Sequence, residues 1–560
     1  MDASNRVQTE DRKEPSIDVD VEQDGKANSS SKAYYIGAAY SGYFDDNEAY
    51  SAKEVKRLRW KLDIRLVPTL GFNIILAATD KACTSTGALY GMREDTHSTG
   101  NRYSWVGSAF YFGYLLWSLP AGSLLQKLPI AKFISVMFFG FGVVLIATTW
   151  VRSFPVFIFL RVLLGAMEAP IIPGGYLILS MWYTRHEQSL RTGFMYTNWS
   201  TIILIGPIGY AVGSIAGGHQ WRWWFIILGA ISIVWSCVVG LFLPDNVVRA
   251  KFIGEREKAI AVERVRGDQL GMENKTFKRE QVVEALLDPK TWLMFFFNVF
   301  VSIPNGGLTN FQSLIIKGLG FSSRKAVLLG MPEGVVGTIS TYSCSLAVWY
   351  LTKRWPNKQS RVAIIVVGEL IGMIASIFLY TLPLTEVGGR LACLWLAKFF
   401  LGPYIVSLSL NVANISGHTK KITVQALIFI AYCTFNIIAP QFFIDSQAPL
   451  YPLGMGAILG AYVLAIITIV LYALYCFYEN RRRDRIDSTR GERVHVDTDF
   501  KDLTDKQNIH FRPYRCLSTV STRADPEHPG TISASETDSR QFIGANGDPE
   551  DIRSGLSSYH

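Results

Sequence analysis

The chain has few of the side chains that bind metals or act as acids and bases. It holds 8 histidines and 7 cysteines in 560 residues, and charged residues make up only 18% of it. The cysteines stand singly, without the CxxC spacing typical of metal and redox sites. The polar stretches contain no phosphate-cradling glycine loop and no nucleophile–base arrangement. We therefore expect neither an enzyme nor a metal, haem or other cofactor.

Long apolar runs fill most of the chain instead, and hydrophobic residues make up 49% of it. A hydrocarbon core about 30 Å thick needs about 20 apolar helical residues to cross it, and a helix satisfies its own backbone groups in lipid. The sequence predicts an all-α membrane protein with twelve transmembrane helices in two six-helix bundles, and no histidine falls inside a predicted span. The predicted spans are 62–82, 104–123, 131–151, 154–178, 192–215, 223–243, 290–314, 327–351, 361–382, 389–411, 422–443 and 455–478.

These spans divide the chain into five predicted parts. They are a cytosolic N-terminal tail (1–60), an N-terminal six-helix bundle (61–244), a cytosolic central loop (245–289), a C-terminal six-helix bundle (290–480) and a disordered cytosolic tail (481–560). Segment 51–61 mixes basic and apolar residues, which fits either a helix lying on the inner leaflet or an ordinary solvated lead-in. The final stretch is polar and aperiodic, as is typical of disorder.

Basic residues predict the orientation of the spans. The net charge is +9, and the basic clusters before span 1, between spans 8 and 9 and after span 12 lie on one side of an even number of spans. Short loops rich in Lys and Arg stay in the cytosol. We expect both termini and the central loop to be cytosolic, the protein to lie in the plasma membrane as a monomer, and the positive charge to have no role in binding nucleic acids.

Charged residues inside the spans are few, and they form two groups. Asp80 and Lys81 lie near the end of span 1, and Arg161, Gly165 and Glu168 are spaced i, i+4 and i+7 on one face of span 4. An ionisable group at bilayer depth is costly and usually faces a cavity or a partner. The planar guanidinium of Arg161 can bind an anion with two parallel hydrogen bonds, and Glu168 offers a proton-binding carboxylate. The alternatives are a structural ion pair between helices, and snorkelling of Asp80 and Lys81 to the interface.

Helix-breaking residues accompany the charges. Pro170, Pro173 and Gly174 follow Glu168 directly, which predicts a kink in span 4. In span 7 the stretch IPNGGLTNFQS (303–313) places one proline and two glycines in an apolar helix. A broken helix is tolerated at membrane depth where it lines a cavity, whereas the alternative is a kinked helix whose amides bond to neighbours. The neutral hydrogen-bonding residues of interest are Asn305, Asn310 and Gln312, with Asn198 in span 5 and Asn436 in span 11 as weaker examples.

Regularly spaced glycines predict close helix packing in two spans. Gly209, Gly213 and Gly217 recur every four residues in span 5, and Gly456 and Gly460 do so in span 12. Small residues on one helix face let two backbones approach closely in a membrane.

Several stretches of the chain resemble the major facilitator superfamily, and within it the fungal anion:cation symporter family. The resemblance is to the allantoate-permease-like clade and covers about residues 60–480. It rests on ATDK, GNRYSWVGSAFYFGYLLWSLPAG, RVLLGAMEAPIIPG, SMWYTRHEQSLRTG, LPDN, EREKAIAVERVRG, ENKTFK, EALLDPKTW, IPNGGLTNF and GHTKK.

This resemblance implies proton-driven uptake of a small carboxylate-bearing solute, such as allantoate or nicotinate, by alternating access. Lys81 and Arg161 would hold the anion, and Glu168, together with Asp80, would couple proton movement to it. The span 7 amides would bind the neutral part of the solute. The sequence does not identify the solute, because ureides, pyridine carboxylates, short peptides, vitamins and sulfonates all combine an anion with a hydrogen-bonding body.

The chain departs from the family pattern at a few positions. GSLLQKLPIAK carries Gln126 where the superfamily usually has an acidic residue. Glu333 and Lys398 are unexpected charges in spans 8 and 10; they either pair with each other, which avoids two isolated buried charges, or Lys398 contributes to substrate choice. Glu369 in span 9 has no assigned role.

Two other functions remain open on the sequence. Export of an acidic secondary metabolite is suggested by the Gly-Pro pair in IGPIGYAVG (205–213), although the paired glycines that usually complete that motif are absent. A nutrient receptor that keeps the transporter fold but signals through its tail is the third reading.

Overall fold

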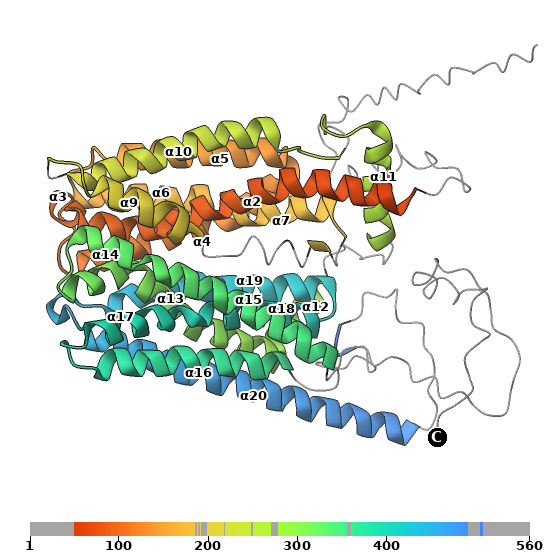
Figure 1. The fold of residues 1–560 in the computed structure, drawn as a ribbon. Helices are drawn as coiled ribbons and strands as arrows, with labels where there is room; N and C mark the ends of the chain where they lie inside the picture. The colour runs from red at the N-terminus through yellow and green to blue at the C-terminus, as the bar shows by residue number, and fades with distance from the viewer. Residues whose placement is uncertain are drawn as a thin grey trace, which may run out of the picture. The chain divides into compact units, whose positions relative to one another are not determined.

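The computed structural model describes residues 50–184, 187, 188, 191, 199–217, 219–247, 250–269, 278–354, 360–490 and 504–507. These residues belong to one compact unit built of helices and short connections (Figure 1). The predicted site residue Asn198 lies outside the described residues.

Two sets of helices face each other, with the central loop between them in the sequence. The first set is α2 (Ala52–Leu89), α3 (Met92–Asp95), α4 (Arg102–Lys127), α5 (Ile130–Thr148), α6 (Phe154–Glu168), α7 (Ile171–Trp182), the π-helix η1 (Thr201–Ile205), α9 (Gly206–Val212) and α10 (Gln220–Phe242). The central loop holds α11 (Glu255–Gln269) and α12 (Arg279–Leu287). The second set is α13 (Pro289–Gly318), α14 (Ser323–Leu329), α15 (Met331–Arg354), α16 (Ser360–Thr381), α17 (Val387–Leu396), η2 (Ala397–Phe400), α18 (Leu401–Asn414), α19 (His418–Ile438), η3 (Ala439–Phe442), η4 (Asp445–Gln447) and α20 (Pro452–Arg490).

Both sets use the same pattern of helix packing. In the first set α4 packs against α6 and α5 against α10, and in the second set α15 packs against α18 and α16 against α20. Between the sets, α2 packs against α13, α4 against α19, and α9 against α14. We call the end of the bundle where α11 and α12 lie the central-loop end, and the end where α3 and α14 lie the distal end (Figure 1).

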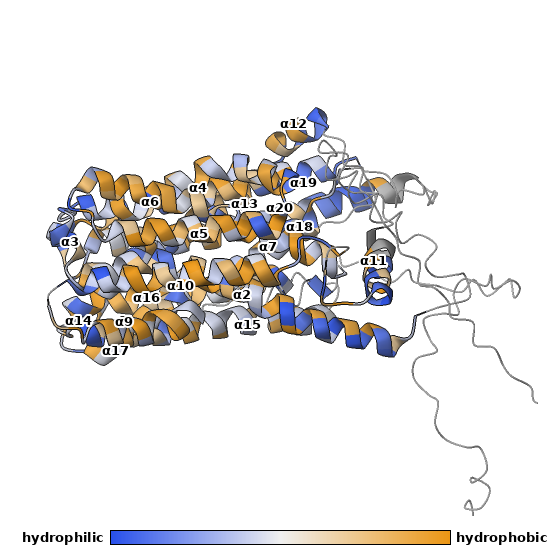
Figure 2. Cartoon of the chain, turned by 90° about the horizontal axis from the view of Figure 1, so that it is seen from above, coloured by the Kyte–Doolittle hydropathy of each residue, from blue (hydrophilic) through white to orange (hydrophobic). Residues whose placement is uncertain are grey.

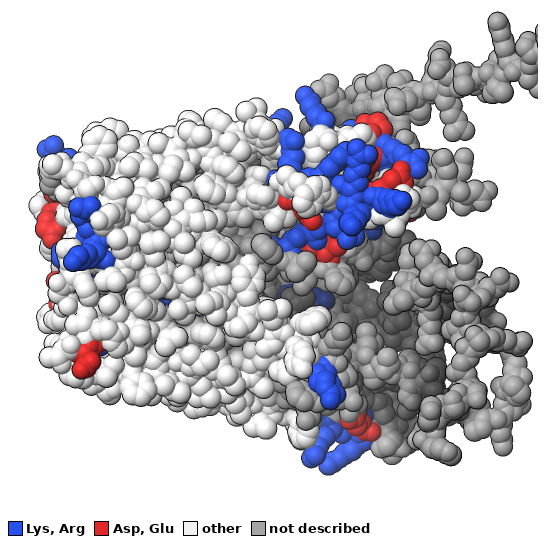
Figure 3. All heavy atoms as spheres, viewed as in Figure 1, with Lys and Arg blue, Asp and Glu red and all other residues white. Residues whose placement is uncertain are grey.

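The described helices match the predicted spans in number and order. Within the described part of the chain, nine helical segments are long and apolar enough to cross a membrane, and helices α4, α9 with η1, and α15 occupy the three remaining predicted spans. The surface agrees with this arrangement. Lys, Arg, Asp and Glu gather at the two ends of the bundle, and a broad uncharged band separates them (Figure 3). Apolar residues dominate the helices between those ends (Figure 2).

Two helices extend beyond their predicted spans, and the disorder predicted for the start of the C-terminal tail is wrong. Helix α2 begins at Ala52, inside the predicted tail, because Ser51 and Glu54 form a capping box: each side chain accepts a hydrogen bond from the other residue's backbone N–H. Helix α20 continues through the first ten residues of the tail that was predicted to be disordered. Arg483 pairs with Glu479 one turn earlier, at 2.9 Å, which supports the helix beyond the apolar span.

The two expected helix breaks have different outcomes. The break in span 4 is confirmed, since α6 ends at Glu168 and α7 begins at Ile171. The predicted interruption of span 7 is wrong, because α13 runs unbroken past Pro304. Its glycines serve close packing instead: a Cβ on Gly306 would lie 3.0 Å from Ala439, and one on Gly307 would lie 2.6 Å from Phe443.

The glycine pattern of span 5 is confirmed in part. A Cβ on Gly209 would lie 2.9 Å from Val327, and one on Gly213 would lie 2.6 Å from Arg324, so α9 lies close to α14 of the other set. The prediction for Gly456 and Gly460 is wrong, because no atom of the described residues lies within 4 Å of the position of a Cβ on either of them. Those two glycines stand on an open face of α20.

The two sets are joined toward the distal end. Arg93 of the first set contacts Asp445 of the second at 2.6 Å, and the Tyr103 hydroxyl donates to the Asn310 carbonyl at 2.9 Å. One apolar core runs through both sets on this side and continues to the central-loop side of the second set. The first set has a separate core on its central-loop side. At the central-loop end the Arg191–Asp63 pair, at 2.7 Å, forms within the first set.

Candidate functional site

Four charged side chains from α2 and α6, of which Lys81 is partly exposed and the other three are buried, form two ion pairs. Nζ of Lys81 lies 2.6 Å from Oε1 of Glu168, and Nη1 of Arg161 lies 3.2 Å from Oδ1 of Asp80. Asp80, Arg161 and Glu168 are each at most 1% exposed. The snorkelling alternative therefore does not describe Asp80. Arg161 and Glu168 share one helix face, as the spacing predicts, but each takes its partner from α2.

Gly165 explains how α6 presents these side chains. A Cβ there would lie 1.9 Å from the Phe110 carbonyl oxygen, and a Cβ on Gly113 would lie 1.7 Å from the Val162 carbonyl oxygen. Helices α4 and α6 are thus in backbone contact. Because Gly165 lies one turn from both Arg161 and Glu168, this contact places both charges beside the aromatic face of α4.

Aromatic rings of α4 lie next to the cations. Nζ of Lys81 lies 5.5 Å from the ring centroid of Phe110 and 5.7 Å from that of Tyr114. The guanidinium carbon of Arg161 lies 5.6 Å from the Phe110 ring. Such cation–π contacts stabilise a positive charge where water is scarce.

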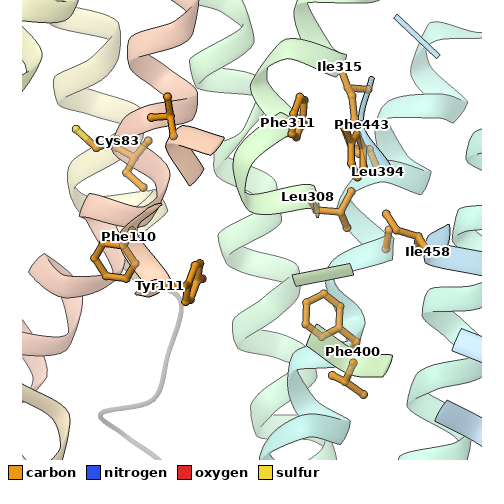
Figure 4. Packing of buried hydrophobic residues seen from close by; sticks show 14 of the residues in the cluster. Cys83, Phe110, Tyr111, Leu308, Phe311, Ile315, Leu394, Phe400, Phe443 and Ile458 are labelled. Atoms are coloured by element: carbon orange, nitrogen blue, oxygen red, sulfur yellow. The ribbon is translucent and has the colours of Figure 1, made fainter. Parts of the chain in front are cut away.

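A narrow pocket opens beside these cations, at the boundary between the two sets of helices. Its lining residues are Lys81, Gly107, Phe110, Tyr111, Arg161, Thr309 and Asn310. Figure 4 shows Phe110 and Tyr111 on one side of this boundary, and Leu308 and Phe311 of α13 on the other. The pocket has essentially no space for a water molecule in this conformation, so a solute would enter only when the lining side chains move.

The second set contributes one predicted amide and an unpredicted hydroxyl to the pocket. Asn310 lies against Gly107, where a Cβ would come within 2.5 Å of the Asn310 amide oxygen. Thr309 accepts a hydrogen bond from Nζ of Lys398 at 3.2 Å. Lys398 also pairs with Glu333 at 2.9 Å, which confirms the expected pair across the second half. Lys398 therefore reaches the pocket wall through Thr309.

Three other predicted amides, those of Asn305, Asn436 and Gln312, lie apart from the lining. The Asn305 amide donates to the Asn436 side-chain oxygen at 2.9 Å, so these two residues join α13 to α19, as the alternative reading of span 7 proposed. Gln312 is 5% exposed, and its Nε2 has no hydrogen-bond partner among the described residues. The structure thus brings together Lys81, Arg161 and Asn310 at the pocket.

Two polar atoms of the charged cluster have unused hydrogen-bonding capacity. Nε of Arg161 and Oε2 of Glu168 are buried and have no partner among the residues that the structure describes. Buried polar atoms are nearly always satisfied, and exceptions often mark a functional site. The cluster can therefore take up one further donor and one further acceptor without giving up an existing contact.

Sequence reasoning missed the aromatic wall and Thr309. The signal was present in span 2, where Gly107, Phe110, Tyr111 and Tyr114 recur at helical spacing. Aromatic residues are common in apolar spans, so this spacing alone does not separate a pocket wall from ordinary packing. Thr309 lies within the stretch of span 7 that was examined for its amides.

Comparisons with known proteins agree with this architecture. Residues 70–440 match the Major Facilitator Superfamily. The chain is 37% identical to the MFS-type transporter cnsL of Penicillium expansum, over 84% of this chain and 91% of that protein. It is 34% identical to the allantoate permease of Saccharomyces cerevisiae, over 82% and 86% of the two chains. It is also 30% identical to the thiamine pathway transporter THI73 of the same yeast, over 81% and 85%.

Solved structures show the same fold at low sequence identity. A D-xylose–proton symporter superposes with a TM-score of 0.54 at 14% identity, over 73% of this chain and 97% of that chain. A bacterial homologue of the human lysosomal transporter Spinster, in an inward-facing and occupied conformation, superposes with a TM-score of 0.53 at 16% identity, over 73% and 95%. The chain is a multi-pass membrane transporter and not an enzyme: it belongs to the major facilitator superfamily, in the group of fungal transporters that includes allantoate permease.

Proposed function

We propose that this transporter imports a small organic anion together with protons, by alternating access, across the plasma membrane. The observation that carries the proposal is the Lys81–Glu168 pair at the edge of a pocket that Arg161 also lines. A buried ion pair is weak support for stability, because burying both charges costs about as much as their attraction returns. Its position beside a pocket favours a role in binding.

The pair supplies a simple means of coupling. An ionised Glu168 pairs with the Lys81 ammonium, and its negative charge would repel a solute carboxylate that approached Lys81. A proton on Glu168 removes that charge and leaves Lys81 free to bind the solute anion. Proton and anion then stabilise each other's binding, and such coupling is reciprocal by linkage.

Arg161 and Asp80 hold the second charge of the site in place. The planar guanidinium can bind a carboxylate with two parallel hydrogen bonds, and its Nε has no partner among the described residues. The solute's neutral or polar part faces Asn310 and Thr309. Lys398 acts on it through Thr309. This combination fits a carboxylate with a hydrogen-bonding body, and the allantoate named for one relative is such an anion.

The conformation fits one step of an alternating-access cycle. The halves meet toward the distal end, through Arg93–Asp445 and Tyr103–Asn310. With the central loop and both termini in the cytosol, as the distribution of basic residues favours, this is a state closed to the outside. The separate apolar core of the first half on the central-loop side allows the halves to part there.

Uptake into proteoliposomes tests the proposal. The purified full-length protein is given a panel of radiolabelled anions: allantoate, nicotinate, a dipeptide and a sulfonate. We expect at least one of them to accumulate when the outside is acidic, and dissipating the pH gradient to abolish accumulation but not exchange. Accumulation that rises when the gradient is dissipated would support the exporter alternative. Saturable binding of a solute without flux would support the receptor alternative.

A further inference from the structure

Two motifs that the transport site does not use meet the C-terminal tail at the central-loop end. EALLDPKTW (284–292) joins α12 to α13, and GHTKK (417–421) begins α19. Residues 504–507 lie on both. A stretch of tail that is polar by sequence is thus seated against the second half of the transporter.

Asp505 is the centre of this contact. Its carboxylate pairs with the ammonium groups of Lys290 and Lys420, the latter at 2.6 Å. The side chains of Asp505 and Lys420 are fully buried, and that of Lys290 is 3% exposed. Asp288 lies 2.8 Å from Nζ of Lys420 and completes the cluster.

Thr504 forms the second anchor. Its hydroxyl donates to Oε2 of Glu284 at 2.7 Å and accepts from the Gln507 backbone N–H at 3.2 Å. The Thr504 N–H donates to the Gln507 side chain at 3.1 Å, so the segment forms its own turn. Its methyl group lies 3.1 Å from the position of a Cβ on Gly417, whose φ of +93° also favours glycine. The turn before α19 therefore leaves room for the tail.

Lys290 depends on Asp505 for its close charge contact. Without Asp505, the nearest carboxylate to Lys290 in this cluster is Asp288, at 3.8 Å. Lys420 would keep Glu284 and Asp288, at 2.9 and 2.8 Å. Removing the close partner of a buried ammonium is unfavourable, and Lys290 would keep only its longer contact with Asp288. The tail residue is therefore part of a built site.

We propose that residues 504–507 are an intramolecular latch that negative charge at Thr504 opens. The latch binds this site and holds α12 against the beginnings of α13 and α19. Glu284 accepts the Thr504 hydroxyl hydrogen, so a phosphate or carboxylate at position 504 would face a like charge at hydrogen-bond distance. Helix α19 leads from this site to Asn436, which contacts α13 at Asn305. The latch thus connects the tail to the second set of helices.

Hydrogen–deuterium exchange of the purified full-length protein tests the latch without any substrate, so its outcome is independent of the proposed transport function. The reporting amides are those of Thr504, Gln507, Lys420 and Lys278, which donate to side chains of the latch or its site. Asp505→Asn should speed their exchange by at least about tenfold. Lys506→Gln is the matched control, because Lys506 is an exposed member of the same turn.

A second pair of variants tests the response to charge. Thr504→Val removes the hydroxyl and should speed exchange by about threefold to tenfold. Thr504→Glu adds a carboxylate facing Glu284 and should speed exchange more than Thr504→Val does. Unchanged exchange in Asp505→Asn, or equal acceleration in Lys506→Gln, would overturn the latch. Slower exchange in Thr504→Glu than in Thr504→Val would overturn its opening by negative charge.

Discussion

The ammonium of Lys81 lies 2.6 Å from the carboxylate of Glu168, and Glu168 is the last residue of α6 before the break at Ala169 and Pro170. The pair therefore joins α2 to the point where span 4 changes direction. Opening this pair removes a link between two helices as well as a charge contact. Binding of a proton or of an anion can thus alter both the pocket and the helix packing around it.

Arg161→Lys should weaken substrate binding. Lysine keeps the charge but has a single point-like head, which cannot form the two parallel hydrogen bonds of a guanidinium. We expect the half-saturation concentration for the transported anion to rise by at least about tenfold, measured as initial uptake rates in proteoliposomes. Arg152→Lys is the control, because Arg152 is exposed between α5 and α6. An unchanged half-saturation concentration would show that Arg161 does not bind the anion.

Asp445→Asn should loosen the distal contact between the halves. The Asp445 side chain is 39% exposed and that of Arg93 is 15% exposed, so solvent screens the pair. Exposed pairs contribute about 0.2–1 kcal/mol. Loss of the pair should therefore speed the labelling of a cysteine introduced by Ser104→Cys, at a buried position, by at most about fivefold. A membrane-impermeant maleimide measures that rate. Asp445→Glu keeps the charge and should label like the parent; equal rates in all three proteins would exclude the pair from closure.

Glu369→Met should leave stability unchanged or raise it. Glu369 is fully buried, and neither of its carboxyl oxygens has a hydrogen-bond partner among the described residues. Replacing an unsatisfied buried polar group by an apolar one of similar shape is neutral or stabilising. Glu333→Met, in contrast, leaves Lys398 unpaired and should cost about 3–5 kcal/mol. Thermal unfolding in detergent compares the two variants, and a lower melting temperature for Glu369→Met than for Glu333→Met would contradict this account.

The latch should be insensitive to pH over the physiological range. Burial alone would raise the pKa of Asp505, but Lys290 and Lys420 lower it below its ordinary value. A carboxyl group with a lowered pKa in the folded protein stabilises it above the unfolded pKa, and this contribution is lost only as the pH falls through the folded pKa. Asp288 and Glu284 are the other titratable groups in the cluster. We expect amide protection at residues 504–507, corrected for intrinsic exchange, to be constant from about pH 5 to 8; a loss of protection within that range would contradict it.

The sequence predicted the fold well because the cost of exposing backbone groups to lipid leaves few alternatives to apolar helices. Its errors lie where other interactions extend a helix. The Ser51–Glu54 capping box begins α2 before the apolar span, and the Arg483–Glu479 pair continues α20 beyond it. Neither effect changes hydropathy, so neither moves a predicted span boundary.

The candidate site was predicted in its residue types and not in its pairings. The energetic cost of buried charge identifies Asp80, Lys81, Arg161 and Glu168 from the sequence alone. Which of them pair depends on the rotation of α2 relative to α6, and hydropathy does not specify that rotation. The backbone contact at Gly165 orients α6 against α4. The same limit applies to span 7, where the glycines fit the packing of Ala439 and Phe443 and do not interrupt the helix.

The coupling role of Glu168 is the central claim, and Glu168→Gln tests it most directly. Glutamine keeps the shape of the side chain and a hydrogen-bond acceptor for Lys81, but it does not bind a proton in the physiological range. Reconstituted Glu168→Gln and the parent protein are compared for accumulation under an inward pH gradient and for exchange of labelled against unlabelled anion. We expect exchange to persist while accumulation falls to a ratio of about one, because the gradient no longer acts on the solute. Full accumulation by Glu168→Gln would contradict the account.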